Sequence, residues 1–277
     1  MSNSILIPSQ KGEKNISSAK LVLLGAICGD IIGSWYEFAS TKDYNFKLFT
    51  DISKFTDDTV CSIAIADALI HQEPFAERLQ YWCRKYPRAG YGGMFRRWIC
   101  SDTTEPYNSW GNGSAMRVSA VGAYAKFLDE AMDLAQKTAE ITHNHPEGIK
   151  GAQATVLAIY LALIGKNKEE IKDMIEINFA YDLHRKYDDI QPLYSYEVSC
   201  QKSVPESIIA FLESDDYESA IRKAIAFGGD ADTMGAITGG IAAAFYGEIP
   251  SYILHECLNR LPDEMKDVID KFNSAIN

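Results

Sequence analysis

Residues 228–247 read GGDADTMGAITGGIAAAFYG. After its first residues the stretch is apolar and rich in small side chains, which predicts a buried helix. Asp230, Asp232 and Thr233 would stand at the N-terminus of that helix, where the dipole favours one anionic group. Two carboxylates in an apolar setting repel each other, and burying them unpaired is costly. A hard cation such as Mg²⁺, Mn²⁺ or Ca²⁺ would resolve the conflict. The alternative is an N-cap aspartate with a surface-facing neighbour.

A second stretch, Thr56-Asp57-Asp58-Thr59, also places hydroxyls and carboxylates directly before an apolar run, Val60 to Ile70. Glu37 adds a third acid after the first apolar segment. Any single Asp-Asp pair is unspecific, but three such stretches together predict one site. They lie far apart in the chain, so folding must bring them together.

Two segments carry small residues at a spacing of four. Gly25, Gly29 and Gly33 mark one, and the 228–247 stretch repeats the pattern with Gly235 and Gly239. Each glycine costs helix stability, and close approach of two backbones would explain their presence. We therefore expect two small-faced helices in tight central contact, with carboxylates at their ends. Separate packing of each helix against bulky residues is the alternative.

Bulk composition indicates a soluble globular protein. The 277 residues are 47% hydrophobic and 23% charged, enough for one sizeable core. The formal charge of −11 argues against broad nucleic-acid binding. Six cysteines without paired metal-type spacing suggest reduced core thiols and a cytoplasmic protein. We find no signal peptide and no membrane span.

Helical periods run along nearly the whole chain without a linker. We expect a flexible N-terminus over residues 1–18, then one all-α domain of about a dozen helices over residues 19–277. The first helix would be capped by Ser17 or Ser18 and run to about Tyr36. Residues 39–55 and 181–203 are the least helical, and alternation in the latter allows a short strand or an extended loop.

Three further features could contact a ligand. The turn Gly111-Asn112-Gly113 leads into a helix whose start could bind a phosphate, although a plain turn and cap would look alike. His143 lies in a helix break and would hydrogen-bond a ligand or the backbone. A basic cluster could meet an anionic substrate, but such clusters are more often solvated faces; it comprises Arg84, Lys85, Arg88, Arg96 and Arg97.

The ordered motifs resemble those of the ADP-ribosylglycohydrolase family, from residue 21 to about residue 250. The resemblance rests on Gly29-Asp30 with Glu37 downstream, 56–59, 111–117, Thr142-His143 and 229–233. It implies an orthogonal all-α bundle that holds two Mg²⁺ or Mn²⁺ ions in a central cleft.

Specific roles follow only from this resemblance. Thr56, Asp57 and Asp58 would bind one metal ion, Asp230 and Thr233 the other, and Asp232 would bridge them. The catalytic group implied by the family comprises Glu37, Asp57, Asp58 and Asp232. Substrate contacts would come from Glu37, Asn112, Gly113, Ser114, Met116 and His143. Asp30 also falls on a family position, as a ligand or as a residue behind the ligands.

The implied activity is metal-dependent hydrolysis that releases ADP-ribose from a modified acceptor. Arginine-linked ADP-ribose on protein is the first expectation, by analogy within the family. Serine-linked ADP-ribose, poly(ADP-ribose), O-acetyl-ADP-ribose and modified nucleic acid are the alternatives. A non-catalytic ADP-ribose-binding protein is the alternative of a different class. The partner would be an ADP-ribosylated protein or a small molecule that contains ADP-ribose; the oligomeric state stays open.

Overall fold

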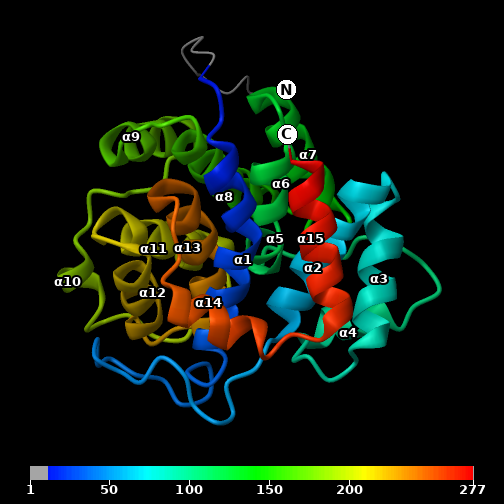
Figure 1. Ribbon diagram of the computed structural model, residues 1–277, viewed down its shortest axis with the longest axis horizontal. Helices are drawn as coiled ribbons and strands as arrows, with labels where there is room; N and C mark the ends of the chain where they lie inside the picture. The colour runs from blue at the N-terminus through cyan, green and yellow to red at the C-terminus, as the bar shows by residue number, and fades with distance from the viewer. Residues whose placement is uncertain (1–11, 277) are drawn as a thin grey trace.

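Fifteen α-helices make up the regular structure of residues 12–276, the part of the chain that this computed structural model describes (Figure 1). They are α1 (Ile16–Gly33), α2 (Asp57–His71), α3 (Phe75–Lys85), α4 (Gly93–Ile99), α5 (Gly113–Met116), α6 (Ser119–Tyr124), α7 (Leu128–Glu140), α8 (Pro146–Leu163), α9 (Lys168–Phe179), α10 (Tyr187–Ile190), α11 (Cys200–Leu212), α12 (Tyr217–Ala226), α13 (Ala231–Tyr246), α14 (Ser251–Leu258) and α15 (Asp263–Ala275).

The all-α prediction is confirmed. Within the described residues the β structure consists of one isolated bridge between Gly111 and Ser199. The 181–203 segment is irregular apart from this bridge, the short α10 and the first residues of α11. The count of about a dozen helices was low because several helices have only one or two turns; α5 and α10 have four residues each. Buried apolar side chains from nearly every helix form one contiguous core cluster.

The antiparallel pair α1 and α13 forms the centre of the fold (Figure 1). A methyl group on Gly25, Gly29 or Gly33 would lie within 2.5 Å of the backbone of Gly239, Gly235 or Ala231 respectively. Glycine therefore permits this backbone contact, and the predicted pairing of the two small-faced helices is confirmed. Because the helices are antiparallel, the C-terminus of α1 meets the N-terminus of α13.

The first helix begins earlier than predicted. Asn15 is its N-cap and accepts a hydrogen bond from the Ser18 backbone N–H at 3.1 Å. The proposed caps Ser17 and Ser18 thus lie inside the helix, and the helix ends at Gly33 rather than near Tyr36. Residues 1–11 of the expected flexible terminus lie outside the described part of the chain.

Helix α1 alone has the length and apolar composition of a membrane span among the described helices. It is 78% buried inside the molecule, however, and α13 covers its glycine face. The same apolar composition is expected of a central core helix.

Candidate active site

Two groups of carboxylates meet where α1, α2 and α13 converge. Asp30, Asp58 and Asp232 form one group, and Glu37, Asp230 and Asp232 form the other. Within each group the nearest oxygens all lie within 4.8 Å of one another. Asp232 belongs to both groups, the position expected of the residue predicted to bridge two ions.

Asp30 holds the N-terminus of α2 against α1. One of its carboxylate oxygens accepts from the backbone N–H groups of Thr56 and Thr59, at 2.9 and 3.1 Å. The hydroxyls of Thr56 and Thr59 donate to the same carboxylate. Asp30 thereby caps a helix other than its own. With both oxygens engaged in this way, it is better suited to positioning the acidic turn than to ligating an ion.

The carboxylates of Asp58 and Asp230 accept fewer hydrogen bonds than that of Asp30. Asp58 Oδ1 is buried and accepts no hydrogen bond in the described residues. Its second oxygen accepts from the Thr233 hydroxyl at 3.3 Å, and Asp230 accepts from the Asn112 amide at 2.8 Å. An unpartnered buried carboxylate oxygen among oxygen-only donors fits a hard divalent cation.

Burial and mutual repulsion of the clustered carboxylates also favour a bound cation. Burial, followed by the charge of Asp232, raises the pKa of Asp30 to about 7. Burial and the charges of Asp232 and Asp30 raise the pKa of Glu37 to about 7, and Lys54 offsets this only in part. Burial also raises the pKa values of Asp57, Asp58, Asp230 and Asp232. A bound cation would reverse these shifts because it favours the ionised carboxylates.

Every carboxylate of the two groups except Asp30 lies on the wall of a cavity of about 350 Å³. Most of the predicted site residues lie on its wall, namely Glu37, Asp57, Asp58, Asn112, Gly113, Met116, His143, Asp230, Asp232 and Thr233. Asp57 lines the cavity but belongs to neither carboxylate group. Its predicted metal contact remains a prediction.

Two predicted residues lie off the cavity wall. Thr56 directs its hydroxyl to Asp30, at 2.7 Å. Ser114 is fully buried and donates to the Gly148 carbonyl at 2.7 Å, so its side chain holds the glycine turn against α8. The Ser114 hydroxyl is therefore not directed at a ligand, and the four-residue α5 gives this turn only a small dipole.

The basic cluster does not reach the cavity: none of its five residues is on the cavity wall. Arg84 instead donates to the carbonyls of Ile99 and Ser101, at 2.8 and 2.7 Å, and Lys85 pairs with Glu264. The cluster thus braces α3 against its neighbours and presents a solvated face, the second of the two interpretations.

Aromatic residues that the sequence did not single out complete the cavity: Phe95, Tyr107, Trp110 and Tyr196. Trp110 and Tyr196 are about half exposed, at 53% and 56%. Both come from irregular segments, where periodicity cannot distinguish a rim aromatic from a core one. Trp110 directly precedes the Gly111-Asn112-Gly113 turn, and this position is the sequence feature that could have identified it as a cavity residue.

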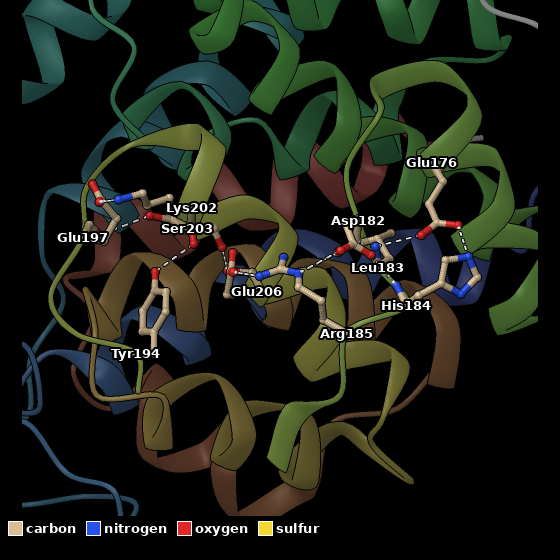
Figure 2. Close-up of polar contacts among 11 residues, drawn as sticks. Glu176, Asp182, Leu183, His184, Arg185, Tyr194, Glu197, Lys202, Ser203 and Glu206 are labelled. Atoms are coloured by element: carbon tan, nitrogen blue, oxygen red, sulfur yellow. Dashed lines mark hydrogen bonds and ion pairs between the residues drawn. The ribbon is translucent and has the colours of Figure 1, made fainter. Parts of the chain in front are cut away.

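Tyr196 reaches the cavity from the segment between α9 and α11, whose anchors are shown in Figure 2. Arg185 binds the buried Glu206 of α11 at 2.6 Å, and the Tyr194 hydroxyl donates to the Lys202 carbonyl at 2.9 Å. Glu197 accepts two backbone N–H groups just before α11, each at 3.0 Å. These contacts hold an irregular segment in one place beside the carboxylates.

Comparison with known proteins gives a consistent result. A sequence model of the family described as ADP-ribosylglycohydrolase matches residues 12–277. The human protein named ADP-ribosylhydrolase ARH3 is 26% identical over 88% of this chain and 90% of its own length. The ADP-ribosyl-[dinitrogen reductase] glycohydrolase of Rhodospirillum rubrum is 26% identical over 89% of this chain and 92% of its own.

Solved structures show the same fold. A chain of an "ADP-ribosylglycohydrolase-related protein complex" superposes with a TM-score of 0.71 at 22% identity. The match covers 95% of this chain and 99% of that one.

Proposed function

This chain belongs to the ADP-ribosylglycohydrolase family, and we propose that it is a divalent-metal-dependent hydrolase that releases ADP-ribose from modified arginine side chains of proteins. The observation that carries the proposal is the pair of carboxylate groups that share Asp232, which lies on the wall of one cavity. Membership of the family makes the chain a hydrolase; the metal and the linkage are our proposal.

The metal ions would be Mg²⁺ or Mn²⁺. Asp58, Asp230 and Asp232 are the buried acids best placed to hold them, with Asp57, Thr56 and Thr233 as the remaining ligands that we propose. When bound, such ions hold substrate hydroxyls and lower the pKa of a bound water. The oxygen-only donor set and the unpartnered Asp58 oxygen support this choice.

The proposed reaction breaks the bond between the anomeric carbon of the distal ribose and the arginine nitrogen. A water oxygen forms the new bond to that carbon, and the leaving nitrogen gains a proton. Positive charge develops on the ribose in the transition state, and the nearby Glu37 and Asp57 carboxylates would stabilise it. Glu37 or another cluster acid would accept the proton of the water.

Analogy within the family supports arginine as the acceptor. The charge of the cavity wall does not distinguish the linkages, because its five carboxylates and Arg117, together with the two proposed divalent ions, would leave almost no net charge. The Rhodospirillum rubrum relative is named for a protein acceptor, dinitrogen reductase.

The test is release of free ADP-ribose from arginine-modified and from serine-modified protein, with Mg²⁺ and with EDTA. We expect metal-dependent release from arginine. Asp57→Ala and Asp232→Ala should abolish it while circular dichroism shows an intact fold. Asp51→Ala, which removes an exposed carboxylate outside the cavity, is the matched control.

Other outcomes would redirect the proposal. Release only from serine would overturn the linkage and keep the hydrolase. Binding of ADP-ribose without metal-dependent turnover of any linkage would indicate a binding protein instead. An undiminished rate in Asp232→Ala would overturn the site. We also propose a cytoplasmic location, since all six cysteines are free thiols.

A further inference from the structure

Arg117 is a buried cation that the proposed reaction does not use. It is 1% exposed and forms no ion pair among the described residues. Its Nη2 donates to the Thr138 carbonyl at 2.8 Å and to the Thr142 hydroxyl at 2.7 Å. Holding a charge in this way is costly, and so it calls for an explanation.

Thr142 connects Arg117 to the histidine of the cavity. The Thr142 hydroxyl lies 2.7 Å from His143 Nδ1, and Thr142 is fully buried. Arg117 can only donate, so the hydroxyl proton of Thr142 must go to another acceptor. Among the hydrogen bonds of the described residues, the acceptor within reach of this hydroxyl is Nδ1 of His143.

The other ring nitrogen of His143 faces the ligand space. His143 lines the cavity, and its Nε2 makes no hydrogen bond with the described residues. A methyl group on Gly113 would lie 3.1 Å from Nε2, so a side chain at this position would crowd it. Burial and the charge of Arg117 hold the pKa of His143 well below its usual range, so the ring is neutral. A neutral ring that accepts at Nδ1 carries its proton on Nε2.

We propose that Arg117 and Thr142 are positioning residues that hold His143 in the Nε2–H tautomer, so that it donates a hydrogen bond to an oxygen of bound ADP-ribose. The inference rests on the proposed function for the identity of the ligand, but the tautomer does not depend on turnover. Arg117 orients the Thr142 hydroxyl because its own N–H occupies one side of that oxygen. The histidine thus offers a donor at any pH where the enzyme is folded and the ring is neutral.

The experiment is ¹⁵N NMR of histidine-labelled protein, with and without ADP-ribose. The chain has five histidines, and His143→Gln identifies the resonances of this one. We expect a protonated Nε2 and an unprotonated Nδ1 in the wild type. Thr142→Val should mix the tautomers and weaken ADP-ribose binding by about tenfold, the effect of losing one hydrogen bond to a charged group. Thr142→Ser should restore both.

Thr138→Val is the matched control. It also removes a buried threonine hydroxyl beside Arg117, but that hydroxyl donates to the Ala135 carbonyl at 2.9 Å rather than to the histidine. Its tautomer and affinity should match the wild type. A proton on Nδ1 in the wild type would overturn the proposal, as would an unchanged tautomer in Thr142→Val. The wild-type spectrum alone shows which ring nitrogen of His143 carries the proton, even if a variant fails to fold.

Discussion

Replacing Gly29 with alanine tests the close contact on which the site depends. The added methyl would lie 1.9 Å from the Gly235 carbonyl oxygen, whereas ordinary contact begins near 3.4 Å. The obstacle is backbone, so no side chain can rotate away, and the two central helices must separate by about 1.5 Å. Overpacking of this kind costs about 3 kcal/mol, and the better helix propensity of alanine returns about 1 kcal/mol. We expect a net loss of about 2 kcal/mol.

Urea unfolding followed by circular dichroism measures this loss. Gly93→Ala is the control, because a methyl there meets no atom within 4 Å and should leave the free energy of unfolding unchanged or slightly higher. Hydrolase activity should fall in Gly29→Ala, since the shift would move Glu37, which follows α1, away from Asp230 and Asp232 at the start of α13. A Gly29→Ala variant as stable as the wild type would refute the argument.

Three further outcomes are expected. Asp30→Asn should destabilise the protein by about 2 kcal/mol, because an amide cannot accept all the hydrogen bonds that cap α2; a urea midpoint equal to the wild type would contradict this. In EDTA the melting temperature should fall as the pH rises from about 4.5 to above 7. Folding raises the pKa of Glu37 to about 7, so the contribution of this group to the free energy of unfolding is fully present below its unfolded-state pKa and is lost as the pH rises through its folded-state pKa. Mg²⁺ should flatten that fall, and a metal-independent profile would count against the cation site. Arg185→Gln should cost about 1–3 kcal/mol by leaving Glu206 buried and unpaired, and Arg185→Gln with Glu206→Gln should recover part of it, which a double-mutant cycle measures.

The central helix pair could be predicted from the sequence because its signal is local. Glycines at a spacing of four define one face of a helix, and only a close neighbour explains their cost. The carboxylates at the helix ends followed from the same argument. Asp232 could also be singled out, since it is the second residue of a helix that is buried along most of its length.

The rest depended on contacts between distant segments. That Asp30 caps α2 follows from the meeting of two helices, which no pattern within either one encodes. Ser114 lies in a turn whose sequence is typical of ligand-binding turns, yet its hydroxyl donates a hydrogen bond to the Gly148 carbonyl. Tyr196 enters the cavity from an irregular segment whose position is set by the anchors Arg185 and Glu197. Side-chain direction in such segments is decided by tertiary packing.

The most direct test of the dinuclear site is the number of Mn²⁺ ions bound per chain, measured by equilibrium dialysis and electron paramagnetic resonance. Because Asp232 belongs to both carboxylate groups, the wild type should bind two ions and give the spectrum of a magnetically coupled pair. Asp232→Asn should lose the coupling and at least one ion. A single uncoupled ion in the wild type, or two coupled ions retained in Asp232→Asn, would contradict the shared site.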